Sequence, residues 1–400
     1  MNARSAVRRT ARWRKAVAAA TAGAVLAAAI GGGAAWAAPP AADQRSTVTV
    51  LQHGLDDLHG LGVSGTQGLV RDDAQTTVAR SGVADLDTGA PMPVDGYFRI
   101  GSETKTFVSV VLLQLVGEGR IRLDDPIEQW LPGVVDGNGN DGRHVTVRQV
   151  LQHTSGLYDP TGDLPALQSA DEFLEHRFDH YTEAQLVAMA MQHPPLFAAG
   201  THWSYSNTNY LIAGMLIERV TGHRWYNEVR SRILMPLRLT RTFYPGDRPT
   251  LPKPHAEGYQ QFAPGGSLVD TTVFNPTVAA SAGGLVSTTN DLARFWQALG
   301  RGQLLRPGQM AELHQTVLAE SVQEVRPGIA YGLGIMWIPN RCGGYWAHFG
   351  DMPGVSTLNA VTPDGHRSAV FYRATVLADP DRAPAVMQRE MALLDDLICG

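Results

Sequence analysis

Lysine is almost missing from this sequence, although basic residues are not. Of 33 lysines and arginines, only Lys15, Lys105 and Lys253 are lysines. An ammonium group loses its proton far more readily than a guanidinium group when it is removed from water. A lysine in a chain that otherwise uses arginine therefore indicates a position where a base is needed. Lys105 is the strongest candidate, because it lies where a strand-like run meets an apolar helical run.

Cysteine is also scarce, and Cys342 and Cys399 are the only two in the sequence. No Cys/His cluster has metal-ligand spacing, and the pair His176 and His180 lacks a third ligand. We therefore expect neither a metal nor a cofactor. In an exported protein, two distant cysteines most simply form one disulfide, here between the last strands and the C-terminal helix. Two free buried thiols are the alternative.

Basic runs and long apolar runs are confined to the first 37 residues. Six basic residues precede the apolar segment 16–33, and Ala35-Trp-Ala37 is a small-x-small cleavage pattern. We expect an export signal cleaved near Ala37 and a secreted protein without a stable membrane anchor; an uncleaved anchor is the alternative. Without those six basic residues the formal charge of −5 becomes −11 for residues 38–400, which argues against nucleic acid as a partner.

Helical and strand-like patterns are unevenly distributed along the chain. Residues from about 103 to 250 are mostly helical, with loops expected at 132–143 and 158–164 and with Thr146, Thr182 and Ser206 as expected N-caps. Both flanks mix helices and strands, which implies a sheet assembled from the two ends of the chain. The elements expected in the flanks are helices over 46–61, from Thr289 and over 383–398, a hairpin over 65–71 and 76–84, and strands at 97–100, 329–338, 343–349, 355–361 and 368–374.

Gly101-Ser-Glu-Thr-Lys105 contains the first candidate site residues. If a helix begins near Ser102, Ser102 and Lys105 share a helix face one turn apart. The backbone N–H of Ser102 then lies in the first turn, where the helix dipole favours negative charge. A hydroxyl nucleophile needs a base for its proton and donors for the oxyanion that follows. Ser-x-x-Lys supplies the hydroxyl and the base, although the motif also occurs by chance on solvated helices.

Two further stretches could complete such a site. Tyr205 lies at an expected helix start, and a tyrosine beside an ammonium ionises more easily and can shuttle a proton. The amide of Asn207 could hold both the lysine and a substrate carbonyl. In His348-Phe349-Gly350, expected on a strand, the histidine could donate to the substrate or the tyrosine, and the glycine would let a substrate backbone approach. A capped helix and a core histidine are the corresponding structural alternatives.

In this order, the three motifs resemble those of the penicillin-recognising serine enzymes. The match is to the class C β-lactamase-like branch, and most closely to exported D-alanyl-D-alanine carboxypeptidases of actinomycetes, over residues 46–400. The family's Ser-x-x-Lys, Tyr-x-Asn and Lys- or His-x-Gly motifs are matched by Ser102/Lys105, Tyr205/Asn207 and His348/Gly350. The resemblance implies an α/β, β-lactamase/transpeptidase-like fold: an antiparallel sheet flanked by helices, with an inserted all-helical subdomain. One domain over 38–400 is expected, with its α/β part at about 46–101 and 251–400 and its helical part at about 103–250.

Acyl transfer through an acyl-enzyme on Ser102 is the chemistry that the resemblance implies. Lys105 and Tyr205 would relay the serine proton to the leaving group. Asn207 and His348 would orient this network, and the backbone N–H groups of Ser102 and Asp351 would surround the oxyanion. Gly350 and Phe349 would lie beside the substrate. The cysteines Cys342 and Cys399 would form the family's single disulfide.

Several activities are compatible with this resemblance. The leading expectation is a D-alanyl-D-alanine carboxypeptidase or transpeptidase acting on peptidoglycan-like peptides, as a monomer. An esterase, an amidase, a D-aminopeptidase or a β-lactamase on the same fold is the alternative. A non-hydrolytic penicillin-binding sensor belongs to a different class, and the complete Ser/Lys/Tyr/Asn/His set argues for turnover instead.

The sequence departs from the carboxypeptidase pattern where that family binds the free carboxylate of the terminal D-Ala. Tyr331-Gly-Leu-Gly334 is followed by an Ile-Met pair instead of an arginine, and Phe349 and Asp351 replace two hydroxyl residues. Two like charges about 4 Å apart repel by roughly 1 kcal/mol even in water. We therefore expect amides, esters or substrates with an amine to be preferred over free acids. Two arginines could restore the carboxylate contact by folding into the site, Arg341 and Arg373.

Overall fold

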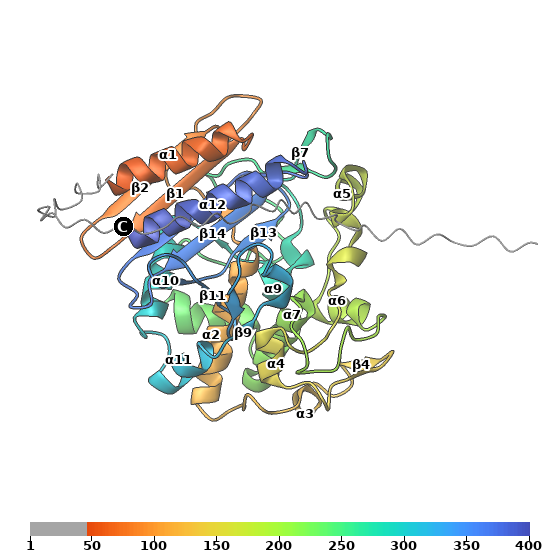
Figure 1. The fold of residues 1–400 in the computed structure, drawn as a ribbon. Helices are drawn as coiled ribbons and strands as arrows, with labels where there is room; N and C mark the ends of the chain where they lie inside the picture. Colours follow the sequence, from red (N-terminus) through yellow and green to blue (C-terminus); the bar gives the residue numbers. More distant parts are fainter. Residues whose placement is uncertain (1–45) are drawn as a thin grey trace, which may run out of the picture. The chain divides into compact units, whose positions relative to one another are not determined.

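The computed structural model describes residues 46–400; the expected export signal and its cleavage near Ala37 lie outside the described residues. Within 46–400, nine strands form one sheet in the order β2-β1-β15-β14-β12-β11-β10-β9, with β13 also paired to β14 (Figure 1). Every pair in this sheet is antiparallel. The strands are β1 Gly65–Arg71, β2 Thr76–Gly82, β9 Val317–Leu318, β10 Ala330–Tyr331, β11 Met336–Ile338, β12 Tyr345–Ala347, β13 Gly350–Met352, β14 Val355–Val361 and β15 Ser368–Arg373.

The sheet contains strands from both ends of the described chain, as the sequence predicts, and the two terminal helices meet on one of its faces. Helices α1 (Thr47–Gly60) and α12 (Arg382–Cys399) lie side by side there (Figure 1). The buried leucines of α1, Leu51, Leu55 and Leu58, follow the 3–4 spacing of an amphipathic helix. A Cβ atom on Gly54 would come within 2.3 Å of Leu393, so the missing side chain allows the two helices to approach closely.

Helix α10 (Thr289–Gly300) packs on β1, β14 and β15 of the sheet and also touches α2 (Thr104–Gly117). The rings of Phe107 on α2 and Phe295 on α10 stack with centroids 3.7 Å apart. All but three of the 14 residues of α2 are buried, so it is a core helix with no solvent face along most of its length. The helix that begins just after Ser102 is therefore held rigidly from every side.

In the segment expected to be helical, every regular element except one small hairpin is a helix or a helical turn, although loops take up about half of its residues. A small hairpin interrupts it, because Gly137 and Gly139 allow left-handed turns within a stretch expected to be loop. Thr146 and Thr182 each form a capping box, as expected. The elements are α3 Ile127–Trp130, β4 Asp136–Gly137, β5 Asn140–Asp141, α4 Val147–Gln152, η2 Pro160–Asp163, η3 Pro165–Leu167, α5 Ala170–His176, α6 Glu183–Ala190, α7 Asn207–Thr221, α8 Trp225–Val229 and the π-helical turn η4 Arg230–Leu234.

Short elements join the sheet to the helical part. The turn η1 (Gly101–Glu103) links β3 to α2, and the other pieces lie between α8 and β10 or after β15. No helix within residues 46–400 has the length and apolarity required to cross a bilayer. The remaining elements are β3 Phe98–Arg99, β6 Tyr259–Gln261, β7 Leu268–Asp270, η5 Pro276–Val278, α9 Ala280–Gly283, β8 Val286–Ser287, α11 Pro307–Leu313, η6 Glu320–Val322 and β16 Thr375–Val376.

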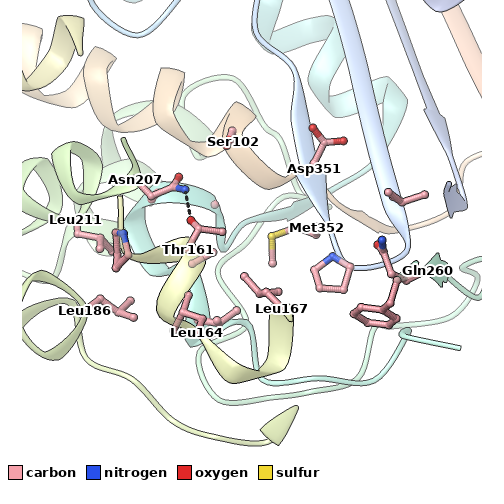
Figure 2. A pocket seen from close by; sticks show the side chains of 18 of the residues that line it. Ser102, Thr161, Leu164, Leu167, Leu186, Asn207, Leu211, Gln260, Asp351 and Met352 are labelled. Carbon is pink, nitrogen blue, oxygen red and sulfur yellow. Dashed lines mark hydrogen bonds between the residues drawn. The ribbon is translucent and has the colours of Figure 1, made fainter. Parts of the chain in front are cut away.

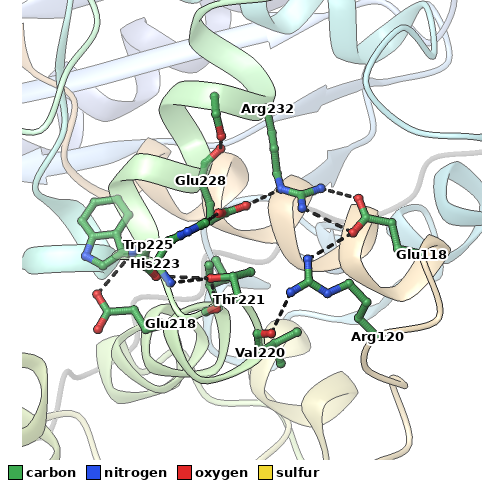
Figure 3. A network of polar contacts seen from close by, with 11 residues as sticks. Glu118, Arg120, Glu218, Val220, Thr221, His223, Trp225, Glu228 and Arg232 are labelled. Atoms are coloured by element: carbon green, nitrogen blue, oxygen red, sulfur yellow. Dashed lines mark hydrogen bonds and ion pairs between the residues drawn. The ribbon is translucent and has the colours of Figure 1, made fainter.

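An ion-pair network fixes the C-terminal end of α2 (Figure 3). Arg232 of η4 donates to Glu118, which follows α2, and its Nε lies 2.5 Å from a carboxylate oxygen of Glu228. Glu228 is only 6% exposed and also contacts His223. Hydrogen bonds from Arg232 and His223 offset the free-energy cost of burying the Glu228 carboxylate in its charged form. The pKa of Glu228 is therefore lowered although burial acts to raise it.

Two strand predictions were wrong in detail. The run 329–338 is not one strand but β10 and β11, separated by a turn at Gly334, where φ is +96° and Ser109 occupies the space of a Cβ atom. His348 was expected on a strand, but β12 ends at Ala347 and β13 begins at Gly350. The side chain of Asn359 accepts from the His348 N–H and donates to its C=O, replacing the ladder hydrogen bonds at this break.

Cys342 and Cys399 form a disulfide, with Cα atoms 5.7 Å apart and a sequence separation of 57. It joins the turn after β11 to the end of α12. The cross-link therefore connects the hairpin of β11 and β12 to the C-terminal helix, which packs on β14 and β15.

We expect the double variant Cys342→Ser/Cys399→Ser to be folded but less stable. A loop of this length restricts the unfolded chain enough to stabilise the protein by about 2–4 kcal/mol. Urea denaturation of both proteins, with the single variants as controls, measures the loss. An unchanged unfolding midpoint would mean that the cross-link adds nothing to the packing of α12.

Candidate active site

Ser102 lies on the turn η1, which is packed backbone-to-backbone against β13. Gly101 has φ +51°, and a Cβ atom there would lie 2.7 Å from the backbone nitrogen of Asp351. A Cβ atom on Gly350 would lie 2.0 Å from the Ile100 carbonyl oxygen and 3.0 Å from the Ser102 nitrogen. Only glycine fits at both positions. The contact places the N–H groups of Ser102 and Asp351 in the same small region.

The Lys105 side chain is fully buried and points back to the serine. Its Nζ lies 2.9 Å from Ser102 Oγ, 2.7 Å from Asn207 Oδ1 and 2.7 Å from the carbonyl oxygen of Ala282 on α9. The last two atoms can only accept hydrogen bonds. A neutral amine has two N–H groups and one lone pair. When these N–H groups bond to the two carbonyl oxygens, the lone pair is left facing the Ser102 hydroxyl.

The electrostatic surroundings favour this neutral amine. Burial lowers the pKa of Lys105 to about 7, and the carboxylate of Asp159 opposes part of that shift. Near neutral pH a large fraction of the lysine is therefore unprotonated. An amine with this pKa is suited to accept a proton from a hydroxyl.

Tyr205 contacts the same centre through its ring. The ring centroid lies 4.9 Å from Lys105 Nζ, and the buried ring of His153 packs on it at 4.3 Å. Burial raises the pKa of Tyr205 well above its ordinary value, while hydrogen bonding to Ser102 acts in the opposite direction. The expectation that the ammonium makes this tyrosine ionise more easily was wrong, because desolvation dominates. The phenol is neutral and can pass a proton only as a hydroxyl.

Asn207, at the first residue of α7, uses both ends of its amide within the protein. Its Oδ1 accepts from Lys105, and its Nδ2 donates to Asp159 at 3.1 Å and to Thr161 Oγ1 at 3.0 Å. Both N–H groups of the amide are thus occupied. A contact between this amide and a substrate carbonyl stays a prediction, and it would have to replace or share one of these two hydrogen bonds.

His348 contacts a different tyrosine from the one expected. It is 1% exposed, its Nε2 lies 2.9 Å from the hydroxyl of Tyr331, and its Nδ1 lies 2.7 Å from the Phe349 carbonyl oxygen. Burial, followed by the charge of Lys105, lowers the pKa of His348 to about 3. The imidazole is neutral, with Nδ1–H donating to the carbonyl and Nε2 accepting from Tyr331. It supports the aromatic wall behind Tyr205 and donates to neither Tyr205 nor the pocket.

Ser102 opens onto a pocket of about 370 Å³ between the sheet edge and the helical part (Figure 2). Among the described residues that line it, Asp351 is the only charged one, and most of the others are apolar. Arg341 pairs with Asp396 and Arg373 with Glu390, so neither arginine lines it. The apolar lining includes Leu164, Leu167, Leu186, Leu211, Phe262, Val278, Met352, Pro353 and Val376.

Sequence reasoning missed three contributors to this site. Asp159 and Thr161 fall in a stretch expected to be a loop, and Ala282 contributes only a backbone oxygen. Asp159 followed by Pro-Thr is a turn-initiating signal that could have marked this segment as ordered. Within residues 46–400, no group of three or more His, Cys, Asp or Glu side chains is arranged to hold a metal ion.

Comparison with known proteins agrees with this geometry. A D-stereospecific amidohydrolase from a Streptomyces species is 40% identical, with a TM-score of 0.77 over 84% of this chain and 97% of the other. A D-amino acid amidase from Ochrobactrum anthropi SV3, complexed with L-phenylalanine amide, is 26% identical, with a TM-score of 0.74 over 88% and 99%. Penicillin-binding protein 4* of Bacillus subtilis is 25% identical over 77% of this chain and 67% of its own length.

The family model described as Beta-lactamase matches residues 49–390. This match spans the sheet, the helical part and every candidate catalytic residue. The chain therefore belongs to the beta-lactamase family of serine hydrolases and has its β-lactamase/transpeptidase-like fold.

Proposed function

We propose that this chain hydrolyses amides of amino acids that carry a free ammonium group and a large apolar side chain, with a preference for the D configuration. The observation that carries the proposal is the charge of the pocket. Its one charged lining residue within the described chain is the exposed acid Asp351, on a wall that is otherwise largely apolar. A cationic group is attracted to such a site and a carboxylate is repelled.

The position of Asp351 supports the placement of the ammonium. Its backbone N–H lies beside that of Ser102 and its carboxylate lines the same pocket. A carbonyl oxygen held by the two N–H groups places the substrate's α-carbon, and the ammonium on it, close to this carboxylate. The leucine-lined part of the pocket is then available for the side chain. The preference for D substrates rests on the printed activities of the two amidohydrolase relatives.

The proposed reaction uses Ser102 as nucleophile and Lys105 as base. Ser102 Oγ attacks the amide carbon while its proton moves to the Lys105 lone pair, and the oxyanion forms beside the Ser102 and Asp351 N–H groups. The proton then passes, through the Tyr205 hydroxyl, to the leaving nitrogen, and ammonia or an amine departs. A water molecule attacks the ester carbon, returns a proton through Lys105 and releases the free amino acid and Ser102.

A D-alanyl-D-alanine carboxypeptidase is the second candidate. The likeness to penicillin-binding protein 4* and the Ser/Lys/Tyr/Asn set favour it. That activity needs a cation for the terminal carboxylate, and Arg341 and Arg373 form ion pairs with Asp396 and Glu390 instead.

We propose a secreted location for either activity, because disulfides such as Cys342–Cys399 persist in oxidising compartments.

A substrate panel separates the two candidates. We expect D-phenylalanine amide to be hydrolysed at least tenfold more efficiently, in kcat/KM, than a peptide ending in D-Ala-D-Ala. Intact mass spectrometry of the protein during turnover should show the acyl adduct, and Ser102→Ala should abolish both adduct and turnover. A clear preference for the free-acid peptide over its C-terminal amide would overturn the proposal.

The pH dependence of acylation should follow the protonation of Lys105. Because the neutral amine is the base and burial lowers its pKa to about 7, kcat/KM on D-phenylalanine amide should rise with pH through about 7. At higher pH it should fall again, because the ammonium group that Asp351 attracts in the substrate loses its own proton. Lys105→Arg keeps the charge but cannot lose the proton, so activity should fall by about 10²–10⁴-fold at every pH. A wild-type profile that is flat between pH 5 and 9 would contradict the assignment of the base.

Asp351→Asn tests the ammonium contact while the backbone N–H remains. We expect KM for D-phenylalanine amide to rise about tenfold or more, which corresponds to roughly 1.4 kcal/mol of binding. The matched substrate 3-phenylpropionamide has no ammonium and should be affected little. Equal losses on both compounds would show that Asp351 acts on the oxyanion site and not on the substrate's charge.

A further inference from the structure

The orientation of the Asn207 side-chain amide is not fixed by its own helix. An amide side chain has an accepting end and a donating end of nearly the same shape, and only the oxygen can accept from Lys105 Nζ. If the amide were turned over, two N–H groups would face a nitrogen that is itself a donor toward Ala282. The site works only when the amide is held in one of its two orientations.

One carboxylate outside the three sequence motifs holds this orientation. Asp159 accepts from Asn207 Nδ2 at 3.1 Å and from the Asn207 backbone N–H, also at 3.1 Å. Thr161 completes the arrangement: its N–H and hydroxyl donate to Asp159 at 3.0 and 2.6 Å, and its oxygen accepts from Asn207 Nδ2 at 3.0 Å. Figure 2 shows the Asn207–Thr161 contact on the pocket wall.

The same carboxylate replaces the missing cap of α7. Ser206 occupies the N-cap position, as expected, but its side chain makes no capping hydrogen bond and donates to the Tyr158 carbonyl oxygen instead. Asp159 takes the first N–H of α7 from a different segment. A negative charge at a helix N-terminus is favourable, so the loop before η2 and the start of α7 hold each other in place.

The Asp159 carboxylate also acts electrostatically on the Lys105 ammonium. The other ionisable groups around that nitrogen are His153 after α4, Tyr205 before α7, Tyr210 on α7 and His348 between β12 and β13. Burial lowers the pKa of both histidines and raises the pKa of both tyrosines, so all four are neutral near pH 7. Among the described residues, Asp159 alone opposes the effect of burial on Lys105.

We propose that Asp159 is a positioning residue that fixes the Asn207 amide with its oxygen toward Lys105 and sets, by its charge, how readily Lys105 gives up its proton. The charge part of this inference concerns the lysine itself and holds whatever the substrate is. The kinetic part rests on the proposed function. Without the Asp159 carboxylate, the Asn207 amide can turn over, and the Lys105 ammonium loses the negative charge that stabilises it against burial.

The scarcity of lysine makes the decisive experiment direct. Protein labelled with ¹³C at the lysine Cε shows at most three lysine signals, and the exposed Lys253 is assigned by Lys253→Arg. We expect the titration midpoint of Lys105 to fall by about 0.5 pH unit or more in Asp159→Asn. Asp163→Asn is the matched control, because Asp163 lies in the same segment but contacts His193, and it should leave the midpoint unchanged.

Kinetics provide the second readout. In Asp159→Asn, kcat on D-phenylalanine amide should fall about tenfold with KM little changed, and the rise of kcat/KM with pH should move to lower pH. Asp159→Glu keeps the charge and should restore the pH midpoint with only part of kcat. Circular dichroism confirms that each variant is folded. If Asp159→Asn does not fold, the test uses two variants that keep a carboxylate, Asp159→Glu and Thr161→Val. The titration midpoint of Lys105 in both must then match that of wild type.

The inference is overturned if the Lys105 midpoint is the same in Asp159→Asn and wild type, or if Asp163→Asn shifts it equally. Failure of the proposed function looks different. In that case wild type hydrolyses none of the amides, yet the lysine titration still differs between the two aspartate variants.

Discussion

Burial of one amine among oxygen atoms that can only accept hydrogen bonds is the constraint on which this structure depends. Lys105 has no exposed surface, and Asn207 and Ala282 take two of its N–H bonds, so its third position faces Ser102. The packing of α2 between α10 and the helical part keeps water away from it. The low proton affinity of the lysine is thus a property of the whole core, since a looser helix would let water in and restore an ordinary ammonium.

How far the sequence predicts this site depends on whether a role is local. The Ser102/Lys105 pair follows from helical spacing alone, and the sheet built from both chain ends follows from the order of the patterns. The hydrogen-bond partners of the other site residues cannot be read from their local sequence. The Asn207 nitrogen bonds to Asp159, and His348 bonds to Tyr331, because loops and strands far away in sequence arrive there. Whether burial or a neighbouring charge decides the pKa of Tyr205 is likewise invisible without the surrounding atoms.

Under the proposed function, the pocket separates the groups that perform acyl transfer from those that select the substrate. Ser102 and the buried Lys105 act only at the reacting carbonyl, so they place no demand on what lies farther along the substrate. In this proposal the substrate is selected by the pocket wall, where Asp351 stands at a position that carries a hydroxyl in the carboxypeptidase pattern and no arginine is among the described lining residues. One added negative charge at this position favours a cationic substrate over a carboxylate and leaves Ser102 and Lys105 unchanged.

The paired glycines Gly101 and Gly350 have a consequence for how such enzymes diversify. The turn and the strand meet through main-chain atoms. In the proposed reaction the donors to the oxyanion therefore belong to the backbone, and a side-chain replacement farther along the strand leaves them in place. In this proposal, selection for oxyanion binding acts on the backbone N–H of Asp351, whereas selection for substrate recognition acts on its carboxylate. Chemistry and recognition can evolve independently although a few covalent bonds separate them.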